Sequence, residues 1–228
     1  MTELTNYANQ KCNGQDAVTL QTAFALSCNT AFVEMSEQLG ADELRKYAKA
    51  FGVGENYDLG VSTSAGTLGD LPDGAATAQS AIGQRDVTMT ALQAAVMAGT
   101  VANKGTRMQP YLVNRITDAQ MKDVRTTKPK KADQAVNEET AATLTDLMYA
   151  SERSSWGYDG NGFASKTGTA EHGEGLAPHV WYVAFDPERD IAVGVVVKNG
   201  GNLGESATGG KVSGPIGRAI LRAYQGEQ

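Results

Sequence analysis

The 228-residue sequence has little that would link it to a membrane or to nucleic acid. No apolar run approaches the roughly 20 residues that a membrane-spanning helix needs. Positive charge is not in excess: the net charge is −6, and a chain this acidic is not expected to bind nucleic acid. Its one dense basic cluster, Lys128-Pro129-Lys130-Lys131, lies in a polar stretch and is interpreted as a solvated loop.

The start of the chain lacks the basic and apolar regions of a secretory leader, so we expect no signal peptide within it. Taken alone, this indicates a cytoplasmic protein or a piece of a longer exported one. Cysteine is also scarce. Cys12 and Cys28 permit one disulfide, and the residues alone leave a disulfide and two free thiols equally open.

The composition, with 41% hydrophobic and 20% charged residues, is that of an ordinary globular protein. Apolar spacing predicts helices first, then three antiparallel strands near 162–170, 179–185 and 191–197, then a closing helix from about 208 to 224. The fold class is therefore α+β. Residues 54–74 and 117–134 are predicted to be loops. The side chains expected to face the sheet from the closing helix are Val212, Ile216, Ile220 and Leu221.

One stretch, Ser165-Lys166-Thr167-Gly168-Thr169-Ala170, carries the clearest chemistry. On a strand, Thr167 and Thr169 share one face, whereas Lys166 and Gly168 share the other. A lysine with two hydroxyls suits an anion along a strand edge, and Gly168 lets another backbone approach. The alternative is an exposed edge strand that a lysine protects from pairing.

A second polar group, Ser27-Cys28-Asn29, lies in a predicted bend between two helices. Side chains two residues apart there can present a hydroxyl and an amide to one cleft. The alternative is a pair of helix caps, since serine and asparagine both cap well.

Together, Ser27-x-Asn29 and Lys166-Thr167-Gly168 resemble two of the three signatures of the penicillin-recognising acyl-serine enzymes. Residues 27–32, 82–84, 102–105 and 179–185 look like the transpeptidase domain of class B penicillin-binding proteins of the actinobacterial type. The resemblance covers essentially the whole chain. It implies a β-lactamase/transpeptidase-like fold, an antiparallel sheet flanked by helices.

The resemblance also implies the chemistry. Family members cross-link peptidoglycan stem peptides by serine acyl transfer and bind β-lactams, without a metal or other cofactor. Ser27 would shuttle protons, Asn29 would bind the substrate amide, and Lys166 would supply positive charge. Thr167 and Thr169 would bind the substrate carboxylate, the Thr169 N–H would form half of an oxyanion hole, and Gly168 would keep the strand edge open.

The sequence departs from the family in one respect: no serine is followed three residues later by a lysine, so the Ser-x-x-Lys nucleophile is absent. We therefore expect residues 1–228 to form one transpeptidase-like domain that is N-terminally truncated relative to the family. A non-catalytic module that retains the peptide groove is the alternative, and a β-lactamase-like hydrolase ranks third. The full-length family member would lie at the extracytoplasmic face of the bacterial membrane, with the missing segment or cell-wall synthesis proteins as further partners.

Overall fold

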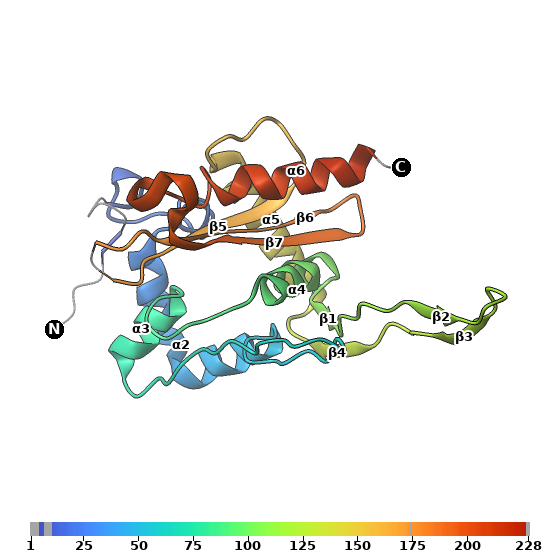
Figure 1. Ribbon diagram of the computed structural model, residues 1–228. Coiled ribbons are helices and arrows are strands. Elements are labelled where there is room, and N and C mark those ends of the chain that lie inside the picture. Colours follow the sequence, from blue (N-terminus) through green and yellow to red (C-terminus); the bar gives the residue numbers. More distant parts are fainter. Residues whose placement is uncertain (1–4, 7–10, 174, 227–228) are drawn as a thin grey trace.

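The computed structural model describes residues 5–6, 11–173 and 175–226 (Figure 1). The α-helices are α1 (Leu20–Ala25), α2 (Asn29–Ala50), α3 (Gly74–Ala81), α4 (Ala91–Ala102), α5 (Glu138–Ser154) and α6 (Ser213–Gly226). Two 3-10 helices are η2 (Cys12–Gly14) and η3 (Lys198–Ser206). The strands are β1 (Thr106–Met108), β2 (Arg115–Thr117), β3 (Asp123–Thr126), β4 (Lys131–Gln134), β5 (Ala164–Ala170), β6 (His179–Asp186) and β7 (Ile191–Val197).

The three predicted strands form an antiparallel meander in the order β5-β6-β7, which confirms the α+β assignment. Lys166 pairs with Val183 across β5 and β6, and Tyr182 pairs with Val195 across β6 and β7. Because only β6 pairs with β5 among the described strands, the other edge of β5 is free.

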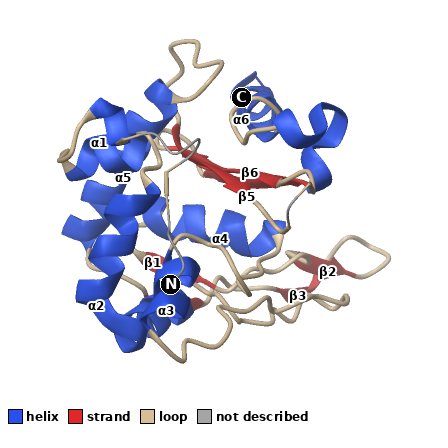
Figure 2. Cartoon of the chain, turned by 90° about the vertical axis from the view of Figure 1, so that its left-hand side faces the viewer, coloured by secondary structure: helices blue, strands red, loops and turns tan. Residues whose placement is uncertain are grey.

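Each face of the sheet has its own core, as the period of two requires. On one face Tyr182 and Ala184 pack with Leu221 of α6. On the other face Phe185 packs with residues of α4 and α5. Figure 1 shows α6 above the sheet and α4 below it, and Figure 2 shows α1, α5 and α2 gathered on one side of the molecule.

Both covering helices approach the sheet through small residues. A Cβ added at Gly217 would lie 2.2 Å from the Tyr182 ring, so α6 packs through its glycine face. Consequently Ile216 and Ile220, expected to face the sheet, are each 44% exposed, and that expectation is wrong. On the opposite face a Cβ at Gly194 would lie 2.3 Å from the Ala91 carbonyl oxygen of α4.

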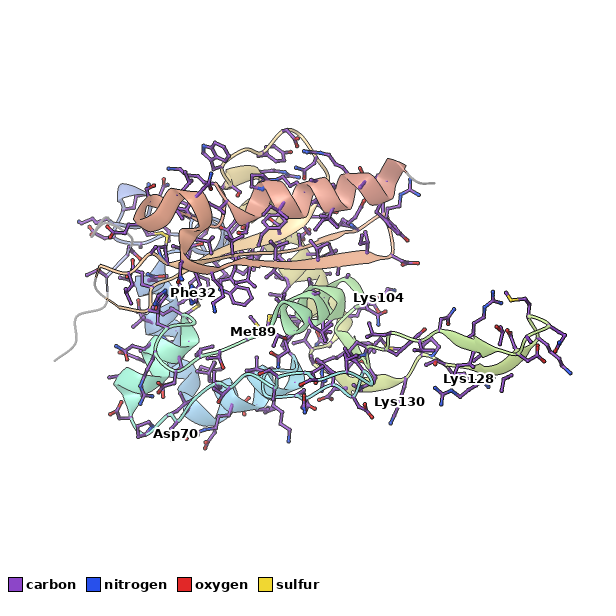
Figure 3. All side chains as sticks on the ribbon, viewed as in Figure 1. Phe32, Asp70, Met89, Lys104, Lys128 and Lys130 are labelled. Carbon is purple, nitrogen blue, oxygen red and sulfur yellow. A yellow bond between two sulfur atoms is a disulfide. The ribbon has the colours of Figure 1, made fainter. Side chains whose placement is uncertain are left out.

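One of the two predicted loops, 117–134, contains regular structure, whereas 54–74 is irregular up to the first residue of α3, as expected. Strands β2 and β3 form a hairpin, with Ile116 opposite Arg125, that projects from the body in Figure 1. Figure 3 shows Lys128 and Lys130 along this arm, away from the sheet. Helix α3 begins at Gly74, the last residue of the other predicted loop, with Asp73 as its N-cap. Few apolar residues mark either segment, so periodicity did not reveal them.

The irregular start of the chain is joined to the bend before α2 by a disulfide between Cys12 and Cys28, whose Cα atoms lie 5.5 Å apart. Cys28 is buried. Closing a loop with a sequence separation of 16 contributes about 3 kcal/mol in the chain-entropy account. The bond thereby restricts the bend that carries Ser27.

A buried carboxylate, that of Glu152 in α5, connects the elements around the free edge of β5. Arg218 Nε of α6 donates to Glu152 Oε1 at 2.6 Å, Asn161 donates to the same oxygen at 2.9 Å, and Ser165 of β5 and the Tyr182 hydroxyl donate to Oε2. Burial alone would raise the pKa of the Glu152 carboxyl, but the hydrogen bonds from Arg218, Ser165 and Asn161, together with the charge of Arg218, outweigh it, and the pKa lies below its ordinary value.

Removing the arginine should therefore leave an unpaired buried charge. We expect Arg218→Met to lower the free energy of unfolding by about 3–5 kcal/mol. The matched control is Arg222→Met on the same helix, whose partner Asp159 is half-exposed and whose loss should cost less than about 1 kcal/mol. Urea unfolding of both variants measures the difference, and equal losses would contradict the account.

Candidate active site

Ser27 sits in an unusual backbone conformation at the bend between α1 and α2. Its φ is 56°, in the left-handed region that residues other than glycine seldom occupy. The bend is held by backbone hydrogen bonds from Cys28 to Ala23 (2.9 Å) and from Ser27 to Phe24 (3.2 Å). A conformation of this kind costs on the order of 1 kcal/mol and persists where the surroundings enforce it. It presents the Ser27 hydroxyl to β5.

Lys166 of β5 meets that hydroxyl. Its Nζ donates to Ser27 Oγ and, at 2.9 Å, to the Thr167 carbonyl oxygen, and it lies 5.8 Å from the centre of the Phe24 ring. Among the described residues no carboxylate forms an ion pair with it. Burial without a counter-charge lowers the pKa of Lys166 to about 8. The amine can therefore exchange a proton close to neutral pH.

Asn29, the other polar residue of the bend, is placed differently. It is the first residue of α2, and its Nδ2 donates to the Thr5 carbonyl oxygen at 3.2 Å. The structure thus brings Ser27 to Lys166, whereas the Asn29 amide is engaged by the start of the chain.

A pocket of about 220 Å³ lies at the free edge of β5. Its lining combines the bend, the end of α5, strand β5 and the segment before α6. Hydroxyl side chains predominate: Ser27, Ser151, Ser154, Ser155, Thr167, Thr169 and Thr208. None of the described residues that line it carries a charged side chain. Thr167 and Thr169, predicted to bind an anion, thus reach the same pocket as Ser27.

A close backbone approach at β5 depends on Gly209 and not on Gly168, whose added Cβ would instead lie 3.3 Å from Trp181 Cβ. A Cβ on Gly209 would lie 2.6 Å from the Gly168 carbonyl oxygen, so residues 208–210 lie directly on the strand. Gly209 N–H donates to Thr169 Oγ1 at 3.3 Å. The Thr169 hydroxyl proton is therefore left to donate into the pocket.

The pocket residues from the end of α5 and before α6 were missed by the sequence analysis. Ser154, Ser155 and Trp156 were taken as part of a polar connection, and Gly209 was placed inside the closing helix, which begins later, at Ser213. The only signal was a tryptophan directly after a serine-rich helix end.

Metal and membrane features are not found in the part of the chain that the structure describes. No group of three or more His, Cys, Asp or Glu side chains is placed to hold a metal ion. No described helix is both long and apolar enough to cross a bilayer.

An antiparallel sheet covered by helices, with a lysine and a serine meeting at its free edge, is the arrangement that the resemblance to penicillin-recognising enzymes implies. Residues 2–222 match the family model described as "Penicillin binding protein transpeptidase domain". The chain belongs to this family, in its class B, actinobacterial group.

Two of the relatives found are mycobacterial transpeptidases. The peptidoglycan D,D-transpeptidase PbpA of Mycolicibacterium smegmatis is 44% identical over 96% of this chain, and that of Mycobacterium tuberculosis is 41% identical over 99%. The chain spans about half the length of these curated relatives, 46% and 48%.

Solved structures agree with the sequence comparison. The crystal structure of PBPA from Mycobacterium tuberculosis matches with a TM-score of 0.90 and 40% identity, over 97% of this chain and 52% of that one. Its ceftriaxone acyl-enzyme complex matches with a TM-score of 0.91 and 41% identity, over 96% and 51%.

The low pKa of Lys166 gives a direct test of the site. In protein labelled with ¹³C-lysine, one Cε resonance should titrate near pH 8, far below the usual value of about 10.4. Because the unfolded chain then binds more protons between about pH 8 and 10.4, the free energy of unfolding should rise with pH across that window.

The control for this titration is Lys166→Met, which should remove the resonance that titrates near pH 8 and the matching part of the stability profile. If every lysine resonance titrates above pH 10, the Lys166 amine is not desolvated as described.

Proposed function

We propose that this chain is the C-terminal part of a peptidoglycan D,D-transpeptidase domain, which cross-links stem peptides by serine acyl transfer and binds β-lactams. The observation that carries the proposal is the hydrogen bond from Lys166 to Ser27 beside the free edge of β5. Membership of the family supports it, as do the β-lactam acyl-enzyme complexes of the mycobacterial relative.

The residues of this chain bind and orient the peptide. The stem peptide lies along the free edge of β5, where unpaired backbone groups are available to an added strand. The hydroxyls of Thr167 and Thr169 hold its terminal carboxylate, and the Thr169 N–H supplies half of the oxyanion hole. Lys166 adds positive charge. The Asn29 side chain binds the substrate amide after it leaves the Thr5 carbonyl oxygen, to which one hydrogen bond of 3.2 Å now holds it.

Ser27 carries the proton. A serine in a segment that this chain does not contain attacks the penultimate D-alanine carbonyl, and its hydroxyl proton must reach the nitrogen of the departing D-alanine. Ser27, bound to an amine whose pKa is about 8, can accept and release that proton near neutral pH. A second amine then resolves the acyl-enzyme, and the same route returns a proton.

The segment that holds the nucleophile also covers apolar surface of this chain. Apolar side chains of α1 and α2 remain substantially exposed: Leu20 48%, Met35 38% and Leu39 44%. Exposed apolar side chains on two consecutive helices are typical of an interaction site, which fits a chain that acts as one part of a larger domain. That complete domain works at the extracytoplasmic face of the membrane.

Penicillin labelling tests the proposal. The chain alone should form no covalent adduct with a fluorescent penicillin, since it lacks the Ser-x-x-Lys nucleophile. Fusion to the N-terminal half of the Mycolicibacterium smegmatis relative should restore labelling and raise the melting temperature, because it buries the exposed apolar surface.

The control is the same fusion with Lys166→Ala, which should label at least about tenfold more slowly. Labelling of the chain alone, mapped to a serine within it, would show that the nucleophile is misplaced. A folded fusion that never labels would favour a non-catalytic peptide-binding module.

A further inference from the structure

Trp156 is exposed and yet firmly held. Its side chain is 59% exposed directly after α5, where it lines the pocket. Its carbonyl oxygen accepts a hydrogen bond from Arg218 Nη1 at 2.9 Å, and Arg218 is fixed by the buried Glu152. A Cβ on Gly210 would lie 3.3 Å from Trp156 Cβ, so the segment before α6 packs against it. The main chain from which the indole projects is thus fixed, and an exposed aromatic side chain adds contact area to a binding site.

The pocket has two kinds of lining. Threonine and serine hydroxyls form its polar part, and Thr169 Oγ1 already accepts from Gly209, so its proton is free for an acceptor. Trp156 and Leu26 supply exposed apolar surface from two different elements, the end of α5 and the end of α1. A ligand that satisfies both parts carries a carboxylate beside a small apolar group.

The size of the pocket limits that group. At about 220 Å³ it is smaller than the roughly 300 Å³ at the lower end of drug-sized sites. It can hold the last residue of a peptide, but a bulky side chain would have to displace the indole.

We propose that Trp156 and Leu26 are specificity-determining residues, which restrict the C-terminal residue of the bound peptide to one with a small side chain. This inference rests on the proposed function, because it takes the pocket as the place where the peptide ends. Thr167 and Thr169 hold the carboxylate of that residue. Trp156 and Leu26 border its side chain, and Arg218 fixes the main chain that carries the indole.

Peptide binding to this chain tests the inference, since every lining residue of the pocket belongs to it. The probes are N-acetyl-D-alanyl-D-alanine and N-acetyl-D-alanyl-D-leucine, followed by shifts of backbone amide resonances in ¹⁵N-labelled protein. The alanine peptide should shift Thr167, Thr169 and Trp156 saturably. The leucine peptide should bind at least about tenfold more weakly, the discrimination typical of a small apolar pocket.

Substitutions distinguish a role in selecting the peptide from a purely structural role of the two side chains. Trp156→Ala and Leu26→Ala should each reduce the preference to less than about threefold, mainly by strengthening binding of the leucine peptide. A purely structural role would weaken both peptides together. The matched control is Tyr158→Ala, an exposed aromatic two residues along the same loop that does not line the pocket, which should leave the preference unchanged.

Equal binding of the two peptides by the unsubstituted chain would overturn the inference, as would a preference that survives both substitutions. Absence of saturable shifts with either peptide would also overturn it. Penicillin labelling of the fusion decides the proposed function independently, so a fusion that labels while the peptides are not discriminated leaves that function standing and removes the role of Trp156 and Leu26.

Discussion

The buried carboxylate of Glu152 is the constraint on which the site depends. It receives hydrogen bonds from α6, from β5, from β6 and from the connection before β5, and it can do so only if these elements meet in one arrangement. A buried charge tolerates little displacement, because the loss of any hydrogen-bond partner leaves part of the charge's desolvation cost uncompensated. Ser165, one of those partners, directly precedes Lys166, and Arg218, another, holds the Trp156 carbonyl. The same carboxylate thus fixes both strand β5 and the pocket wall.

The arrangement that Glu152 fixes places polar side chains beside the free edge of β5. On one side of the strand Lys166 reaches the Ser27 hydroxyl, and on the other Thr167 and Thr169 face the pocket. The disulfide from Cys12 to Cys28 holds the bend from its own side. Two segments separated by 139 residues therefore meet at a strand edge whose backbone groups remain available to a peptide. A polar site of this kind is pre-organised before the ligand arrives.

The sequence predicted those parts of the fold that follow a period. Strands β5, β6 and β7 were found within a few residues. The buried faces were harder. Gln93 is buried because its amide donates to carbonyls of the preceding loop, and α6 meets the sheet through Gly217 rather than through isoleucines. In the site, motif spacing identified Lys166 and Ser27. The left-handed φ of Ser27 and the ion pair between Glu152 and Arg218 depend on tertiary contacts, so no local pattern predicts them.

The central claim is that Ser27 and Lys166 interact in this chain itself, before any other segment completes the domain. A double-mutant cycle on Ser27→Ala and Lys166→Met, read as free energies of unfolding, measures that interaction most directly. The account predicts a coupling energy of about 0.5–3 kcal/mol between the two side chains. Single-variant effects that add to within about 0.3 kcal/mol would contradict it.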